Sequence, residues 1–103
     1  MIVLKLALTI ENLFLYVNDF SIFKLYCKEF QEIGKKFFSE ERDENFPSCV
    51  INSYKGSLYF KDFGKGDVKG QNCFKYVMQK YDLKFNEVLH KIVMDFHLED
   101  FFQ

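Results

Sequence analysis

The sequence has 103 residues and a formal net charge of −1, from 14 Lys and Arg against 15 Asp and Glu. This length suits one domain with a modest core. The near-neutral charge argues against a strongly basic nucleic-acid-binding protein, because phosphate contacts need clustered cations. Aromatic residues are abundant, at 19%. They predict a small core filled with large rings, or a few rings kept exposed for base stacking or a protein interface.

Three cysteines are spread along the chain without any Cys-x-x-Cys pair: Cys27, Cys49 and Cys73. Their odd number and apolar neighbours favour buried, reduced thiols in a cytosolic protein over disulfides or metal ligands. The first residues lack the charged region and cleavage site of a secretory signal, and no apolar run reaches the roughly 20 residues of a membrane helix. We therefore expect a cytoplasmic protein.

The first third of the chain predicts two helices after an apolar start. That start fits a strand and a helix equally well, because periodicity cannot decide over so short a run. Thr9 is placed to cap a helix over residues 10–17. Asn18 or Asp19 can cap a second, amphipathic helix that extends to Phe30.

The middle of the chain predicts a β-hairpin. A short strand at residues 35–38 leads into an acidic loop at residues 39–45, which we expect to be a solvated turn. The only proline then forces an extended entry to a strand at residues 48–53. Residues 54–56 have the composition of a hairpin turn, and residues 57–63 alternate as a second strand.

The second strand of this hairpin carries apolar groups on both faces. Leu58 and Phe60 point to one side, whereas Tyr59, Lys61 and Phe63 point to the other. This pattern predicts a central strand. The ring–cation–ring row on the second face is typical of single-strand binding platforms, and core packing under a helix explains the rings equally well.

Two further helices follow a glycine-rich loop at residues 64–70. Asn72 can cap the first of them, and Asp82 breaks its pattern. The second is the clearest element of the sequence, because its apolar residues recur at i, i+3, i+4, i+7, i+8 and i+11. The apolar faces of the two helices are formed by Cys73, Phe74, Val77, Met78 and Tyr81, and by Phe85, Val88, Leu89, Ile92, Val93 and Phe96.

Four lysines lie in or beside the glycine-rich loop. Glycine lets the backbone approach a phosphate and lysine supplies charge, which points to a nucleic-acid backbone contact. The loop lacks the Gly-Lys-Ser/Thr ending of a nucleotide-binding P-loop. Alternatively, this is a solvated loop whose lysines are offset by Asp62 and Asp67. The candidate nucleic-acid-binding residues are Lys55, Tyr59, Lys61, Lys65 and Lys69.

Two acidic segments complete the set of candidate surfaces. If the fold brings them together, they form an anionic surface that could engage the basic channel of a nucleic-acid-handling enzyme. Ordinary solubility charge is the alternative. The candidate protein-interaction residues are Glu40, Glu41, Asp43, Glu44, Asp95, Glu99 and Asp100.

No catalytic constellation is present in the sequence. His90 and His97 have neither a nucleophile nor a carboxylate at a diagnostic spacing, so triad chemistry is not supported. We expect a protein that is not an enzyme and that needs no cofactor.

Several motifs together resemble the N-terminal zinc-ribbon domain of bacterial and phage DNA primases. Phe-Pro-Ser at 46–48 before Cys-Val-Ile-Asn looks like that family's Pro-Ser-Phe strand. Leu-Tyr-Phe-Lys-Asp-Phe-Gly at 58–64 looks like the strand entering its second metal knuckle, and Tyr-Val-Met at 76–78 like the helix after it. Phe-Asn-Glu-Val-Leu at 85–89 resembles the start of its closing helix. The resemblance covers residues 18–96.

The metal ligands of that family have no counterpart here. The family holds zinc with Cys and His at two knuckles, whereas the first knuckle falls within residues 38–42, which contain neither. The second knuckle falls on Asp62 and Lys65. Because structural zinc needs four S or N ligands, the resemblance implies a zinc ribbon without zinc. The synthesis domain of a primase is not part of the resemblance, so its activity is not implied.

We therefore expect one α+β domain over residues 1–103, a metal-free, zinc-ribbon-like antiparallel sheet flanked by helices. The expected function is a phage or mobile-element binding module that acts on a nucleic-acid-processing machine in the host cytoplasm. One form is an anti-CRISPR-like inhibitor of a defence nuclease. The alternative form is a primase-derived module that contacts single-stranded DNA or RNA through residues 61–69. A third interpretation is a piece of a longer primase.

Overall fold

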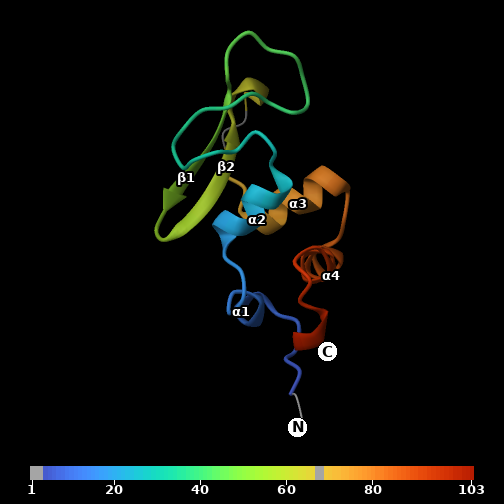
Figure 1. Ribbon diagram of the computed structural model, residues 1–103. Coiled ribbons are helices and arrows are strands. Elements are labelled where there is room, and N and C mark those ends of the chain that lie inside the picture. The colour runs from blue at the N-terminus through green and yellow to red at the C-terminus, as the bar shows by residue number, and fades with distance from the viewer. Residues whose placement is uncertain (1–3, 67–68) are drawn as a thin grey trace.

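The computed structural model describes residues 4–66 and 69–103 and has an elongated α+β architecture, 56 × 27 × 20 Å (Figure 1). A two-stranded antiparallel sheet occupies one end, α2 and α3 lie beside it, and α4 and α1 lie toward the other end. The described elements are α1 (Ile10–Leu13), α2 (Asp19–Tyr26), β1 (Cys49–Tyr54), β2 (Ser57–Asp62), α3 (Cys73–Tyr81) and α4 (Phe85–Asp95), with 3₁₀ turns η1 (Phe63–Lys65) and η2 (Glu99–Phe101).

The two N-terminal helices begin where their caps predict but end early. The Thr9 hydroxyl accepts a hydrogen bond from the Asn12 amide at 3.1 Å, and the Asn18 side chain accepts one from the Ser21 amide at 2.8 Å. The helix expected over residues 10–17 spans only α1. The second helix ends at Tyr26, so the expectation that it reaches residue 30 is wrong.

The hairpin is formed as predicted. β1 and β2 pair with Tyr54 opposite Ser57 and Cys49 opposite Asp62. The two turn residues, Lys55 and Gly56, have φ of 50° and 83°. Positive φ at both positions is the pattern of a type I′ turn, whose twist matches that of the flanking strands.

The sheet is narrower than the sequence suggests. The strand expected at residues 35–38 is reduced to a single bridge between Phe37 and Cys49 on the outer edge of β1. β2 was expected to be central, but among the described residues its outer edge pairs only through Phe60 and Gln71. The central-strand prediction is therefore wrong. The rings on the two faces of β2 have different surroundings, since Phe60 packs against the core and Tyr59 lies on the outer face.

The C-terminal helices follow their predicted caps and cover the core. The Asn72 side chain accepts a hydrogen bond from the Lys75 amide at 2.8 Å, and α3 ends at Asp82 with a φ of 54°. The expected apolar face of α3 holds except for Tyr81, which is 41% exposed, whereas Tyr76 is buried instead. On α4, Phe85 is likewise 41% exposed. The fully buried residues contributed by these two helices include Val77, Val88 and Ile92.

The two ends of the described chain meet at the pole opposite the 39–48 loop (Figure 1). Leu6 and Phe102 form a parallel bridge, with the Leu6 amide donating to Phe101 O at 2.9 Å and the Gln103 amide to Leu6 O at 3.0 Å. Within the described residues 4–9, the apolar start is thus neither of the two alternatives that the sequence left open, but a single bridge followed by irregular backbone.

Candidate nucleic-acid interface

The outer face of the hairpin combines aromatic, amide and cationic side chains. Leu58 and Phe60 face the core, while Tyr59 and Lys61 share the opposite, outer face. That the two pairs lie on opposite faces confirms the predicted strand alternation. Phe63 does not join them, because β2 ends at Asp62. The second face of β2 is therefore a surface rather than a second packed layer.

A shallow pocket of about 450 Å³ lies on this outer face. The rings of Tyr54 and Tyr59 form part of its wall, with centroids 6.4 Å apart and planes at 66°. Asn52 lies directly opposite Tyr59 in the ladder. We call this the hairpin pocket; its lining consists of Asn52, Ser53, Tyr54, Tyr59, Lys61 and Gly70.

Gly70 brings the chain back against the hairpin. A Cβ atom at this position would lie 3.0 Å from Tyr59 Cβ, closer than ordinary van der Waals contact. The neighbouring Gln71 exchanges two backbone hydrogen bonds with Phe60, at 2.8 and 2.9 Å. Gly70 therefore packs its backbone directly on Tyr59, and this close approach favours a glycine.

The predicted lysines are distributed unevenly around the pocket. Lys55 Nζ lies 5.4 Å from the Tyr54 ring centroid, and Lys61 lines the pocket itself. Lys65 is turned away toward the 39–45 loop, where it pairs with Glu41 at 2.8 Å. Lys69 lines a separate groove beside α3. Asp67, invoked above as a counter-charge, lies outside the described residues.

A second concave region, the α3 groove, runs between β2, residues 69–71 and α3. It has an outer compartment of about 250 Å³ and an inner compartment of about 260 Å³. Both compartments are lined by Phe60, Asp62, Lys65, Gln71 and Gln79, so they lie next to each other. The outer compartment adds Lys69, Gly70 and Lys75, and the inner one adds Glu40, Glu41 and Lys80 among others.

The acidic 39–45 loop is not a freely solvated turn. Glu40 pairs with Lys80 at 2.7 Å and accepts a hydrogen bond from the Lys28 amide at 3.0 Å. The Glu44 side chain is only 13% exposed, and it accepts hydrogen bonds from the Ser39 amide and the Ser48 hydroxyl. The expectation of a solvated turn is therefore wrong for these two carboxylates, which hold the loop against the body of the protein.

The only arginine of the chain organises this loop. Arg42 donates to both carboxylate oxygens of Asp62, at 3.0 and 2.6 Å, and to the Ser48 hydroxyl at 2.7 Å. Asp62 also accepts a hydrogen bond from the Gly64 amide at 3.0 Å. A Cβ atom at Gly64 would overlap the guanidinium. Bidentate geometry of this kind fixes orientation as well as charge, which a lysine could not do.

This network joins the two segments that the primase resemblance identifies as metal knuckles. Arg42 belongs to the first and Asp62 to the second, and Glu41 and Lys65 form a parallel link between them. The hydrogen bonds from Arg42 hold the pKa of the Asp62 carboxyl below its usual range. The hydrogen bond from Ser48 likewise lowers the pKa of Glu44. Both carboxylates are therefore charged at neutral pH.

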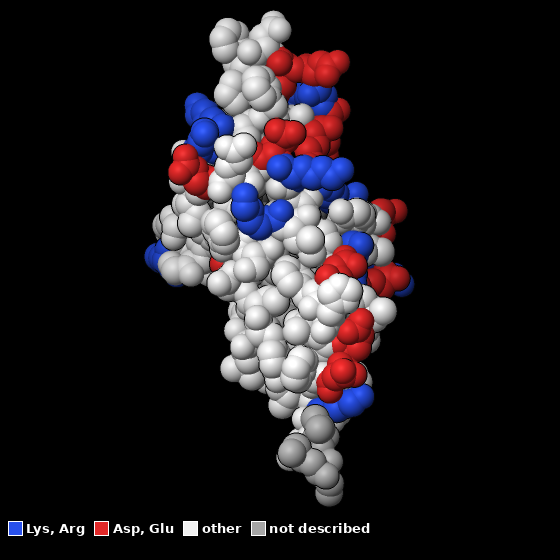
Figure 2. All heavy atoms as spheres, in the orientation of Figure 1, with Lys and Arg blue, Asp and Glu red and all other residues white. Residues whose placement is uncertain are grey.

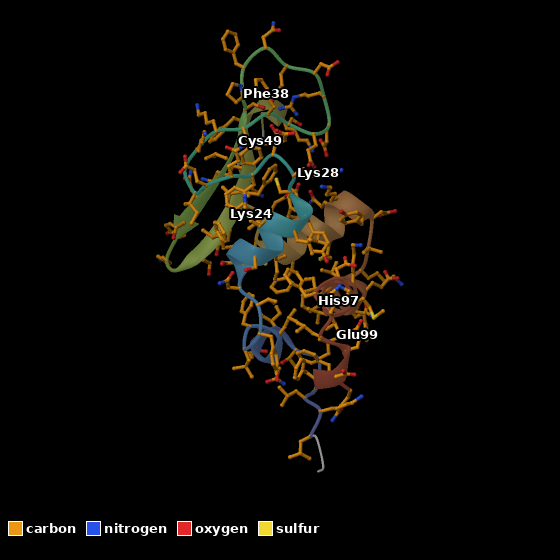
Figure 3. The ribbon with its side chains drawn as sticks, in the orientation of Figure 1. Lys24, Lys28, Phe38, Cys49, His97 and Glu99 are labelled. Atoms are coloured by element: carbon orange, nitrogen blue, oxygen red, sulfur yellow. The ribbon has the colours of Figure 1, made fainter. Side chains whose placement is uncertain are left out.

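The C-terminal acidic residues lie apart from that loop. Asp95 accepts a hydrogen bond from the Tyr26 hydroxyl at 2.7 Å and pairs with Lys91 at 3.1 Å. η2, with Glu99 and Asp100, lies near the opposite pole of the molecule from the loop (Figures 1 and 3). The fold therefore does not assemble the seven predicted carboxylates into one anionic surface.

The cysteines are buried and free, as the sequence predicts. Burial raises the pKa of Cys49 and Cys73 to about 12 and also raises the pKa of Cys27. Such thiols are poor nucleophiles at neutral pH, because the thiolate is the reactive form. Within residues 4–66 and 69–103, no group of His, Cys, Asp or Glu side chains is arranged to hold a metal ion.

Comparison of the chain with family models, with curated proteins and with solved structures gave no match. The primase resemblance thus rests on the motifs quoted above and stays a prediction. None of the described helices has the length and apolar character needed to cross a membrane.

Proposed function

We propose that this chain is a non-enzymatic module that binds single-stranded nucleic acid in the hairpin pocket. The observation that carries the proposal is the pairing of Tyr54 and Tyr59 on an outward face beside Lys61. Bases stack on aromatic side chains irrespective of sequence, and each stacked base contributes about 1–3 kcal/mol. The primase resemblance supports the same direction, because in that family this domain takes part in template selection.

The charge distribution is compatible with this function despite the net charge of −1. Several acidic residues near the hairpin are compensated inside the protein: Asp62 by Arg42, Glu40 by Lys80 and Glu41 by Lys65. Lys55, Lys61 and Lys75 form no ion pair with any described residue. Figure 2 shows blue lysine and arginine atoms interspersed with red ones in the upper part of the molecule. We therefore expect affinity at low salt that falls steeply as salt rises.

The test is fluorescence anisotropy with labelled oligothymidylate and oligouridylate of about 12 nucleotides, within the usual single-strand site size. Tyr59→Ala should weaken binding about 5- to 100-fold, as the loss of one stacked base predicts. Tyr59→Phe, which keeps the ring, should stay close to the wild type. Phe46→Ala is the matched control, because Phe46 is 80% exposed and lies outside the pocket.

Two results would contradict the proposal. One is the absence of binding to either oligonucleotide at low salt. The other is equal weakening by Tyr59→Ala and Phe46→Ala, which would mean that the ring in the pocket has no special role.

We propose, as a second candidate, a protein-binding module that inhibits a nucleic-acid-processing machine such as a defence nuclease. The observation that favours it is a group of exposed apolar side chains in the segment that directly follows α1: Phe14 at 43%, Leu15 at 69% and Tyr16 at 42%. Exposed apolar residues that lie together are typical of protein interfaces. The carboxylates predicted as protein-interaction residues support this candidate less well, since Glu40, Glu44 and Asp95 already bind other groups of the protein.

The two candidates are separated by capture from nuclease-treated host lysate, followed by an activity assay of the captured enzyme. The second candidate predicts inhibition that Leu15→Lys abolishes and Tyr59→Ala leaves intact. Charge reversal should be limited to Asp43, Glu99 and Asp100, because reversal of Glu44 would break the loop that it holds. Inhibition lost with Tyr59→Ala and retained with Leu15→Lys would overturn this candidate.

A further inference from the structure

We propose that a bound single strand continues from the hairpin pocket across Gly70 and lays its phosphates in the outer compartment of the α3 groove. This inference rests on the proposed nucleic-acid function and adds the direction in which the strand runs. It assigns the α3 groove, which the sequence did not single out, as a phosphodiester-binding site.

The first step is that the two concave regions share a wall. Gly70 lines both the hairpin pocket and the outer compartment. It carries no side chain, and its backbone lies against Tyr59. The two hydrogen bonds between Gln71 and Phe60 fix this wall to β2. The boundary that the two regions share at Gly70 is therefore formed by backbone and not by a side chain.

The second step is that the outer compartment offers donors and cations. Lys75 is exposed on α3, and neither a carboxylate nor any other described anionic group pairs with it. The Gln71 and Gln79 amides are hydrogen-bonded to each other across the groove, and amide and ammonium groups are typical phosphate ligands. The one carboxylate in this compartment, Asp62, is neutralised by Arg42. The groove therefore presents a net positive lining to a strand.

The third step decides how far the strand goes. The inner compartment is lined by Glu40 and Glu41 and is spanned by their pairs with Lys80 and Lys65. A phosphate entering there would meet two carboxylates and would have to break two ion pairs. The backbone consequently follows Lys75 and Gln79 along α3 and does not enter the compartment that reaches the buried Cys27 and Cys49.

The experiment compares oligothymidylates of increasing length by anisotropy as a function of salt. For longer oligonucleotides, Lys75→Ala should lower affinity several-fold and reduce the slope of log K against log salt by about 0.7, the value for one phosphate contact on a single strand. Dinucleotides and trinucleotides fill only the hairpin pocket, so their affinity should be unchanged by Lys75→Ala and reduced by Tyr59→Ala.

Two further variants complete the test. Lys36→Ala is the matched control: Lys36 is an exposed lysine that lines neither the hairpin pocket nor either compartment of the α3 groove. Gly70→Ala keeps every ring and lysine but pushes the wall away from Tyr59, and it should weaken long oligonucleotides more than short ones. Thermal melts of all variants show whether each remains folded.

The outcomes separate this inference from the proposed function. Loss of binding in Tyr59→Ala together with an unchanged salt slope in Lys75→Ala would overturn the path across Gly70 and leave the hairpin pocket standing. An equal change in Lys36→Ala and Lys75→Ala would overturn it too, since it would indicate general attraction by surface lysines. No binding of any oligonucleotide by the wild-type protein would overturn both proposals.

Discussion

Each end of this molecule is stabilised by a different kind of interaction. At the hairpin end, the 39–48 loop is fixed by charged and hydroxyl side chains that converge on Arg42 and Asp62. At the other end, α4 packs its apolar face into the core and the terminal segments join through Leu6 and Phe102. Figure 2 shows the same contrast on one face, with charges gathered above and a mainly uncharged surface below, apart from one edge.

This difference shows which interactions stabilise the region around the proposed binding site. Apolar packing involves no titratable group, whereas a network of charged hydrogen bonds depends on the ionisation of each member. The hairpin pocket and the α3 groove lie at the end that depends on charge. Conditions that loosen the network should therefore affect binding before they unfold the protein as a whole.

The largest expected effect is a cavity at the apolar end. Ile92→Ala should lower the free energy of unfolding by about 2–5 kcal/mol, because Ile92 is fully buried and its neighbours can relax only in part. Urea denaturation measures the change. Met94→Ala on the same helix is the control, since Met94 is 57% exposed and should cost under about 0.5 kcal/mol. Equal costs at the two positions would show that the buried face of α4 is misassigned.

The next effect is smaller and belongs to the charged end. Asp62→Ala should cost about 1–3 kcal/mol, because it removes a buried acceptor of several hydrogen bonds and leaves the guanidinium without its partner. Glu41→Ala is the matched control, because its pair with Lys65 is exposed and is worth about 0–1 kcal/mol. Both values come from the same urea titrations. A larger loss with Glu41→Ala would contradict the central place given to Arg42 and Asp62.

The pH dependence sharpens the comparison further. The hydrogen bonds from Arg42 lower the pKa of Asp62, so its contribution is complete above the unfolded value of about 4 and disappears as pH falls through the lowered folded pKa. Acidification below about pH 4 should therefore destabilise the wild type more steeply than Asp62→Asn. Thermal melts across that range measure the slopes. Parallel slopes would mean that the network adds nothing to acid sensitivity.

The smallest effect concerns the hydrogen bond that joins α2 to α4. Tyr26→Phe removes the hydroxyl that donates to Asp95 and leaves the ring against Tyr81. We expect a cost of about 0.5–1.5 kcal/mol, near the lower limit because Asp95 is partly exposed. Chemical denaturation checks the value. A cost equal to that of Ile92→Ala would place this hydrogen bond among the main supports of the fold.

Local sequence patterns account for the elements but not for their surroundings. α4 was predictable because six apolar residues recur at helical spacing, and the hairpin because Gly56 suits a positive φ in a turn between two strand patterns. The burial of Tyr76 was not predicted. Its ring centroid lies 4.8 Å from that of Phe60 on β2 and 5.6 Å from that of Phe23 on α2, so α3 is covered on two sides. A helix covered on two sides buries more than the single face that periodicity reveals.

The candidate site was foreseen in part. Tyr59 and Lys61 share an outward face, as strand alternation predicts. Tyr54 and Gly70 also line the pocket but were not among the predicted site residues. Their positions depend on the pairing of β1 with β2 and on the packing of residue 70 against β2, which no local sequence pattern encodes. The role of Arg42 also escaped, although a single arginine within an acidic stretch is a signal that carboxylates converge on it.

The bridge between Leu6 and Phe102 has a consequence for how this protein is tethered. Anything joined before Leu6 or after Gln103 leaves the fold at the same pole, and the 39–48 loop lies at the far end of a body 56 Å long. A surface anchor, a fluorophore or a second binding module attached there would be separated from that loop by the length of the molecule. For a second module, linker length would then set the effective concentration at which the two sites share one ligand.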